Sequence, residues 1–221
     1  MPPKSEYLRA WSRLHGDAGT GGLVGWWLVG AYRLARPLAG AGISPNAVTG
    51  LGLAVALAAP AVVAWSGPAG AQGHGPLLAS ALVITSGVLD GLDGAVALLT
   101  GRSSRRGFVI DSVCDRIADA AYAAALWSAG APGPLAVAAA AVAWLHEYTR
   151  ARAVPAGMPD VGVVTVAERP TRVIVTASFL LGAGLRPGGA TRWAAAGAAT
   201  WLAVGVVGAV QLGVTVARRL R

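Results

Sequence analysis

Charged residues are scarce in this sequence. Asp, Glu, Lys and Arg make up 13% of its 221 residues, whereas a soluble domain carries about 25%. Apolar residues account for 55%, so there is too little charge to cover a water-facing surface, and lipid is the expected solvent. The single cysteine, Cys114, excludes an internal disulfide and indicates nothing more about the redox compartment.

Lysine is almost absent as well. Lys4 is the only lysine against 17 arginines, a bias typical of GC-rich bacterial genomes. The net charge of +8 would suit a nucleic-acid partner, but the arginines lie between apolar runs and at the C-terminus rather than along one amphipathic face. We therefore expect contacts with membrane lipids and none with nucleic acid. Residues 1–22 lack the apolar stretch of a signal peptide.

Six apolar segments are candidates for crossing a bilayer, which takes about 20 residues per helix. They span residues 45–66, 76–100, 107–129, 132–152, 170–185 and 190–215, the fifth being short. Ahead of them, residues 22–41 are amphipathic and are expected to lie in the membrane interface, and residues 4–15 predict a short surface helix. The expected fold is all-α: a polytopic membrane protein with six transmembrane helices and an N-terminal interfacial amphipathic helix.

The arginines predict the orientation in the membrane. Loops on one side of the six segments carry most of them: Arg102, Arg105, Arg106, Arg150, Arg152, Arg169 and Arg172. The opposite loops, around residues 66–75 and 128–133, carry no charge. Because positive loops stay inside, both termini are expected on the cytoplasmic face of a bacterial plasma membrane. The chain would comprise an N-terminal segment 1–41, a transmembrane domain 42–217 and a basic tail 218–221.

Four aspartates lie inside or at the ends of the second and third segments, where a charge costs at least ~2.5–3.5 kcal/mol and needs a reason. Asp90 and Asp93 are three residues apart, and Asp111 and Asp115 are four apart, so each pair shares one helix face. The short turn around residues 101–106 predicts that the two helices are antiparallel neighbours. The four carboxylates are therefore expected to converge near the cytoplasmic side.

Four carboxylates in a low dielectric repel one another unless cations neutralise them. Arg116 supplies one charge at most, whereas Mg²⁺ or Mn²⁺ suits carboxylates together with substrate phosphates. Two such ions would balance four aspartates. Small residues beside them, Gly94, Ala97 and Gly107, predict a slot for a flat or phosphorylated ligand. The alternative is that these small residues merely allow helices to pack.

Residues 90–115 read D-G-L-D-G-A-V-A-L-L-T-G-R-S-S-R-R-G-F-V-I-D-S-V-C-D. This run resembles the signature of the CDP-alcohol phosphotransferases, D-x-x-D-G-x-x-A-R-x8-G-x3-D-x3-D, in every spacing. One position departs, because Leu98 stands where the signature has arginine. Residues 43–49, I-S-P-N-A-V-T, resemble the start of the family's first span. The resemblance covers about residues 23–215 and implies a phospholipid-synthesis transferase that moves a phosphatidyl group from CDP-diacylglycerol to a small alcohol, releasing CMP.

The resemblance also implies roles for the matching residues. The aspartates would bind two divalent ions, and the last of them would also be the catalytic base: Asp90, Asp93, Asp111 and Asp115. The slot and two neighbouring turns would bind the CDP-lipid through Ser44, Pro45, Asn46, Gly94, Ala97, Ser104 and Gly107. The family's arginine would contact the donor's phosphates. Leu98 cannot do so, and Arg102 or Arg105 from the adjacent loop would have to replace it.

The second half of the chain implies the acceptor. Residues 148–153, Y-T-R-A-R-A, and 168–172, E-R-P-T-R, look similar to the actinobacterial phosphatidylinositol-phosphate synthase and phosphatidylglycerophosphate synthase subgroup. In that subgroup such cations hold the acceptor's phosphate, which implies acceptor binding by Arg150, Arg152, Arg169 and Arg172.

The charge of this basic cluster favours the same acceptor. Four guanidinium groups repel one another without an anion, and Glu147 and Glu168 offset only part of the charge. The excess favours a phosphate-bearing alcohol such as inositol phosphate or glycerol phosphate. A purely structural ion-pair network is the alternative.

Other interpretations stay open. A divalent cation transporter also needs intramembrane aspartates, although usually near the membrane midplane, and a weakly catalytic scaffold would fit the change at Leu98. Whether the chain forms a homodimer is open too. Asp119 continues the aspartate stripe and would either support the metal ligands or pair with Arg116 or another helix. The histidines have no metal-ligand spacing and are expected in surface or packing roles: His15, His74 and His146.

Overall fold

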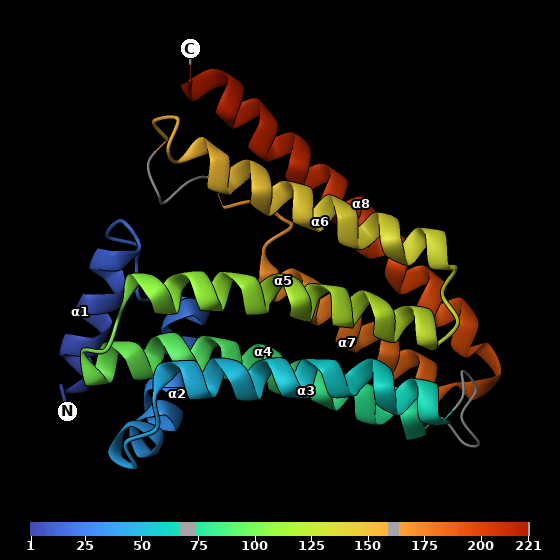
Figure 1. The fold of residues 1–221 in the computed structure, drawn as a ribbon, viewed down its shortest axis with the longest axis horizontal. Coiled ribbons are helices and arrows are strands. Elements are labelled where there is room, and N and C mark those ends of the chain that lie inside the picture. The colour runs from blue at the N-terminus through green and yellow to red at the C-terminus, as the bar shows by residue number, and fades with distance from the viewer. Residues whose placement is uncertain (67–73, 159–163, 221) are drawn as a thin grey trace. The chain divides into compact units, whose positions relative to one another are not determined.

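The computed structural model describes residues 1–66, 74–158 and 164–220, and the regular secondary structure of this part is entirely helical (Figure 1). In chain order the helices are α1 (Lys4–Leu14), α2 (Gly22–Gly40), α3 (Pro45–Ser66), α4 (His74–Thr100), α5 (Arg105–Ser128), α6 (Gly133–Ala153), α7 (Arg169–Leu185), the 3₁₀ turn η2 (Pro187–Gly189) and α8 (Ala190–Arg219). The predicted all-α class is confirmed. Each segment predicted as a helix coincides with one helix, and the largest difference is at the end of α8, which continues to Arg219.

Three helical segments of the described chain are long and apolar enough to cross a membrane: Pro45–Ser66, His74–Thr100 and Pro187–Arg219. They support a membrane location for the protein. The other three predicted spans, in α5, α6 and α7, are not among them, so the prediction of six spans is not confirmed. Helix α7 has only 17 residues, and the first half of α5 carries acidic and basic residues.

The helices group into two compact units. Unit 1 consists of Met1–Leu53 and Ser86–Asp115, and unit 2 consists of Ala54–Thr85 and Arg116–Arg221. The boundary falls inside α3, α4 and α5, so each of these helices contributes residues to both units.

The core of unit 1 joins α1, α2 and the C-terminal part of α4. Tyr7 of α1 is buried, and its ring centroid lies 5.4 Å from that of Tyr32 on α2. One face of α2 is buried through residues spaced three or four apart, namely Gly25, Leu28, Ala31 and Ala35. The opposite face exposes Leu23 and Trp26, the latter to 76%. Because its exposed face carries large apolar side chains, α2 is suited to a surface that is not purely aqueous.

The core of unit 2 is built mainly from alanines around a few large side chains, among them Tyr122, Leu126 and Trp201. Figure 1 shows α8 beside α6, and α7 also packs against α8. The close approach depends on small residues. A Cβ added at Gly208 on α8 would lie 2.3 Å from the Cβ of Ala167, so a side chain there would force the two segments apart.

A tight turn between α4 and α5 positions the aspartates of unit 1. Gly101 adopts a left-handed conformation with φ of 64°, and the amide of Arg102 donates to the carbonyl of Ala97 at 3.1 Å. This is the usual glycine closure of a helix C-terminus. Ser104 then caps α5, because its hydroxyl accepts the amide hydrogen of Gly107 at 3.0 Å. The chain reverses within a few residues, which makes the facing ends of α4 and α5 neighbours.

Candidate functional site

Three carboxylates converge in unit 1. One oxygen each of Asp90, Asp93 and Asp111 can be chosen so that all three lie within 4.8 Å of one another. Asp93 is 6% exposed, and the other two are half-buried. The convergence of α4 and α5 carboxylates predicted from the sequence is therefore found for these three. Asp115 follows Asp111 by one turn of α5 and is half-buried; it is not in the group of three, and its metal-binding and catalytic roles stay predictions.

Asp93 is held in place by two short hydrogen bonds. The hydroxyl of Thr49 on α3 donates to Oδ2 at 2.6 Å, and the amide of Gly94 donates to Oδ1 at 2.6 Å. Thr49 is itself buried. Both donors stabilise the ionised form of the carboxylate and fix its orientation, so Asp93 presents a pre-set carboxylate to the group.

The donor set suits a hard divalent cation. Carboxylate oxygens are the ligands that Mg²⁺ and Mn²⁺ prefer. Three such groups gathered in a partly buried position repel one another, and a bound cation removes that repulsion. The residues present therefore fit the metal that the sequence predicts.

Two of the residues predicted to bind the CDP-lipid are helix caps. The hydroxyl of Ser44 accepts the amide hydrogen of Ala47 at 3.2 Å at the start of α3, and Pro45 occupies the first helical position. Ser104 caps α5 in the same way. These contacts explain why serine occurs at both positions. Binding of the CDP-lipid by Ser44 and Ser104 stays a prediction.

The small residues predicted to line the ligand slot differ in how closely their neighbours pack around them. A Cβ added at Gly94 would meet no described atom within 4 Å, so the space beside Asp93 is open within the described chain. At Gly107, a Cβ would lie 3.0 Å from Oγ of Ser104 and 3.3 Å from Oδ1 of Asn46. A side chain at 107 would therefore make these two polar side chains shift by a few tenths of an ångström, whereas a Cβ at 94 would displace nothing described. The packing explanation fits one residue and fails for the other. Ala97 is half-buried on α4.

The position that departs from the signature lies at the edge of the unit 1 core. Leu98 is half-buried and packs against that core. Arg102 and Arg105, the two proposed substitutes for the missing arginine, are both exposed. Leu98 thus has a packing role, and two cations remain available to a ligand in the neighbouring turn.

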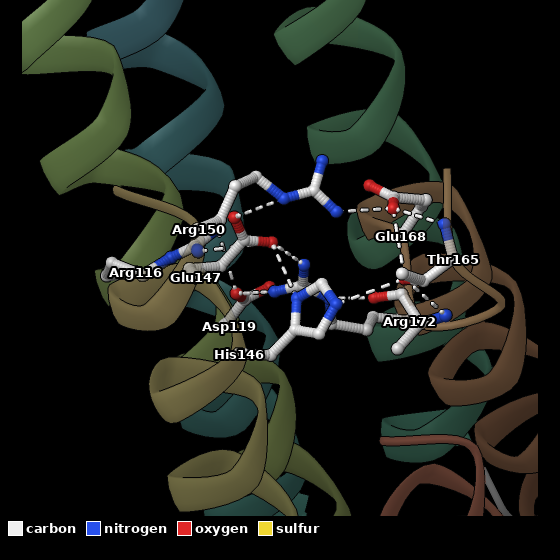
Figure 2. Close-up of polar contacts among 9 residues, drawn as sticks. Arg116, Asp119, His146, Glu147, Arg150, Thr165, Glu168 and Arg172 are labelled. Atoms are coloured by element: carbon white, nitrogen blue, oxygen red, sulfur yellow. Dashed lines mark hydrogen bonds and ion pairs between the residues drawn. The ribbon is translucent and has the colours of Figure 1, made fainter. Parts of the chain in front are cut away.

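The basic cluster of unit 2 contains its own counterions, as Figure 2 shows. Arg172 is 2% exposed, and its guanidinium donates to the carboxylates of Asp119 and Glu147 and to the carbonyl of Ala167. Arg116 lies 3.2 Å from Asp119. The two pairings predicted for Asp119, with Arg116 and with another helix, are therefore both present.

A second part of the same network surrounds the N-terminus of α7. Arg150 donates to Oε1 of Glu168 at 2.5 Å, and the same oxygen accepts the Thr165 amide at 2.8 Å. The Thr165 hydroxyl lies 3.1 Å from Nε2 of His146, a buried residue. His146 is thus buried inside the polar network and not on the surface, and its predicted packing role stays a prediction. Among the predicted acceptor ligands, Arg152 is exposed and Arg169 is half-buried.

Sequence reasoning missed the polar residues that support the others. Thr49 lay within the quoted run 43–49, but nothing in that run says which carboxylate its hydroxyl meets. Thr165 lies in a loop and is 19 residues from its partner His146. The available signal was chemical: a buried carboxylate needs donors, and a threonine at the start of an apolar helix is one.

The class of protein follows from comparison with known sequences. Residues 42–208 match the CDP-alcohol phosphatidyltransferase family. The chain belongs to this family.

Its relatives narrow the comparison. The chain is 34% identical over 165 residues to the phosphatidylinositol phosphate synthase of Mycolicibacterium smegmatis, covering 69% of this chain and 68% of that protein. It is 35% identical over 105 residues to the archaetidylinositol phosphate synthase of Aeropyrum pernix, covering 48% of this chain and 54% of that protein.

Solved structures agree on the fold. The Mycobacterium tuberculosis phosphatidylinositol phosphate synthase with CDP-DAG bound matches with a TM-score of 0.64 and 28% identity, over 84% of this chain and 92% of that one. The same synthase in complex with manganese and citrate matches with a TM-score of 0.67 and 26% identity, over 84% and 88%. The chain is therefore an enzyme of a phospholipid-synthesis family.

Proposed function

We propose that this chain transfers a phosphatidyl group from CDP-diacylglycerol to an alcohol acceptor and releases CMP. The observation that carries the proposal is the carboxylate group of Asp90, Asp93 and Asp111 beside the open space at Gly94. The relative solved with CDP-DAG and with manganese supports both the donor and the need for a divalent ion.

The metal and donor sites are assigned to unit 1. Asp90, Asp93, Asp111 and Asp115 would hold two Mg²⁺ or Mn²⁺ ions, which would neutralise the donor's diphosphate and stabilise the departing phosphate. The donor's CDP group is assigned to residues around the start of α3, the start of α5 and the slot on α4: Ser44, Pro45, Asn46, Gly94, Ala97, Ser104 and Gly107. Support comes from the proximity of Asn46, Ser104 and Gly107.

Asp115 is the proposed general base. Its carboxylate takes the proton of the acceptor hydroxyl as that oxygen attacks the phosphorus next to diacylglycerol. A new bond forms between the acceptor oxygen and this phosphorus. The bond from the same phosphorus to the bridging oxygen breaks, and CMP leaves with that oxygen and the bonding electrons.

The acceptor is assigned to the basic cluster of unit 2. Arg150 and Arg152 end α6 with accessible side chains, and Arg169 and Arg172 begin α7. We assign direct contact with the acceptor to the accessible arginines. Arg172 is a positioning residue, since its guanidinium is buried between carboxylates. The names of the relatives favour an acceptor that carries a phosphate, such as inositol phosphate.

The membrane arrangement completes the proposal. Helices α3 to α8 would form six spans within a domain of residues 42–217, with residues 1–41 lying partly in the interface and residues 218–221 forming a basic tail. Both termini and the site would face the cytoplasm of a bacterial plasma membrane. The exposed apolar face of α2 supports the interfacial placement, and the contrast between the arginine-bearing loops and the uncharged loop 128–133 supports the orientation.

The proposal is tested with purified protein in phosphatidylcholine nanodiscs. CDP-diacylglycerol is supplied with inositol phosphate, glycerol phosphate, inositol, serine or phosphatidylglycerol, and CMP is measured together with the lipid product. We expect CMP release with at least one acceptor, its loss in excess EDTA and its return with Mg²⁺ or Mn²⁺. Full turnover in EDTA, or no CMP with any acceptor, would overturn the proposal. A cation transporter would release no CMP in this assay.

A further inference from the structure

Glu147 on α6 occupies the centre of the cationic groups in unit 2. Its Oε1 accepts a hydrogen bond from Arg172 and lies 3.5 Å from Nη1 of Arg116 and 3.7 Å from Nδ1 of His146. Its Oε2 lies 3.9 Å from Nε of Arg150. Three guanidinium groups therefore surround one carboxylate, as they would surround a bound phosphate (Figure 2).

One part of this ion-pair network is buried and the other part is partly exposed to solvent. Asp119 and Arg172 are 0% and 2% exposed, so separating their ion pair would strand a buried charge. Glu147, Arg116 and Arg150 are 23%, 21% and 27% exposed. Within this network, an anion arriving from solution can reach the second group, in which Glu147 lies between the two arginines, but not the buried pair.

The charges of the network already cancel. The cations are Arg116, Arg150 and Arg172, and the anions are Asp119, Glu147 and Glu168. These six residues carry three charges of each sign; Arg152 and Arg169, which are also assigned to the acceptor, are not among them. A phosphate that binds to Arg116 and Arg150 therefore competes with the Glu147 carboxylate, which lies 3.5 Å and 3.9 Å from these two guanidinium groups.

We infer that Glu147 is the specificity-determining residue of the acceptor site: its carboxylate competes with the acceptor's phosphate for Arg116 and Arg150. This inference rests on the proposed function for the identity of the acceptor. Glu147 weakens the binding of phosphate-bearing acceptors. It thereby reduces the preference of the site for a phosphorylated acceptor over the free alcohol. Replacing its charge leaves one surplus cation at the accessible end of the network.

The direct test measures phosphate binding without catalysis. Inorganic phosphate and inositol phosphate are titrated calorimetrically against wild-type protein and Glu147→Gln in phosphatidylcholine nanodiscs. We expect both anions to bind the variant at least about tenfold more tightly than the wild type. The reason is that the negative carboxylate of Glu147, which repels the phosphate and competes with it, has been removed. Glu147→Ser is a second variant with the same expected direction. Glu6→Gln, an exposed acidic residue of α1, is the matched control and should bind as the wild type does.

The kinetic test uses the acceptor panel. In Glu147→Gln, the KM for inositol phosphate or glycerol phosphate should fall about tenfold while the KM for CDP-diacylglycerol and for free inositol stays constant. Unchanged or weaker phosphate binding in both folded variants would overturn the inference, since Glu147 would then organise the arginines rather than compete. Displacement of bound phosphate by phosphatidylglycerol in the nanodisc would assign the site to a lipid headgroup and overturn it too. If the wild type releases no CMP, the proposed function fails while the calorimetric result still tests the competition.

Discussion

The hydrogen bond from Thr49 to Asp93 gives the sharpest test of the carboxylate group. Thr49→Val keeps the shape of the side chain and removes its hydroxyl, so Oδ2 of Asp93 loses a donor at 2.6 Å. Both residues are buried, which restricts the replacement of this donor by water.

The expected magnitude follows from the geometry. A hydrogen bond to a charged group contributes about 1.5–3 kcal/mol, which corresponds to about 10- to 140-fold in a binding constant. Loss of a partner that orients a metal ligand typically costs about 10–100-fold in metal affinity. We therefore expect Mn²⁺ affinity to fall at least tenfold in Thr49→Val.

The assay is Mn²⁺ binding followed by electron paramagnetic resonance, with CMP release measured in parallel. Thr49→Ser restores the hydroxyl and should recover most of the affinity. Thr85→Val is the matched control, since the hydroxyl of Thr85 bonds to the Ala81 carbonyl of its own helix at 2.8 Å. Mn²⁺ affinity within twofold of wild type in a folded Thr49→Val protein would refute the positioning role of Thr49.

Three further predictions address other parts of the site. Asp115→Asn should abolish CMP release but keep most CDP-diacylglycerol binding, because three carboxylates remain; near-normal turnover would contradict its role as the base. Leu98→Arg should lower the apparent KM for CDP-diacylglycerol by restoring a cation, and an unchanged KM combined with a large loss in Arg102→Ala would show that the loop arginine has taken over. Arg172→Leu should destabilise the fold by about 3–5 kcal/mol in denaturant unfolding, because Asp119 would lose its closest buried partner; exposed Arg192→Leu should change stability little, and an equal effect of the two would contradict the buried pair.

The sequence was sufficient for the all-α class and for the convergence of Asp90, Asp93 and Asp111. Long apolar runs predict helices without knowledge of their neighbours, and spacings of three and four place side chains on one helix face. The convergence of Asp90, Asp93 and Asp111 also needed a tight turn, and Gly101 within a short polar stretch predicted it. Each of these inferences depends on residues close together in the chain.

The state of the acceptor arginines was decided only by the tertiary structure. From the sequence, Arg172 and Arg150 were two equivalent cations beside two glutamates. The structure distinguishes the two arginines. Arg172 is buried and pairs with Asp119, which lies 53 positions earlier in the chain, whereas Arg150 is partly exposed. Which carboxylate pairs with which guanidinium depends on helix packing across long sequence separations. The charges and the number of possible partners were fixed by the sequence alone, but their pairing was fixed by the packing of α5, α6 and α7.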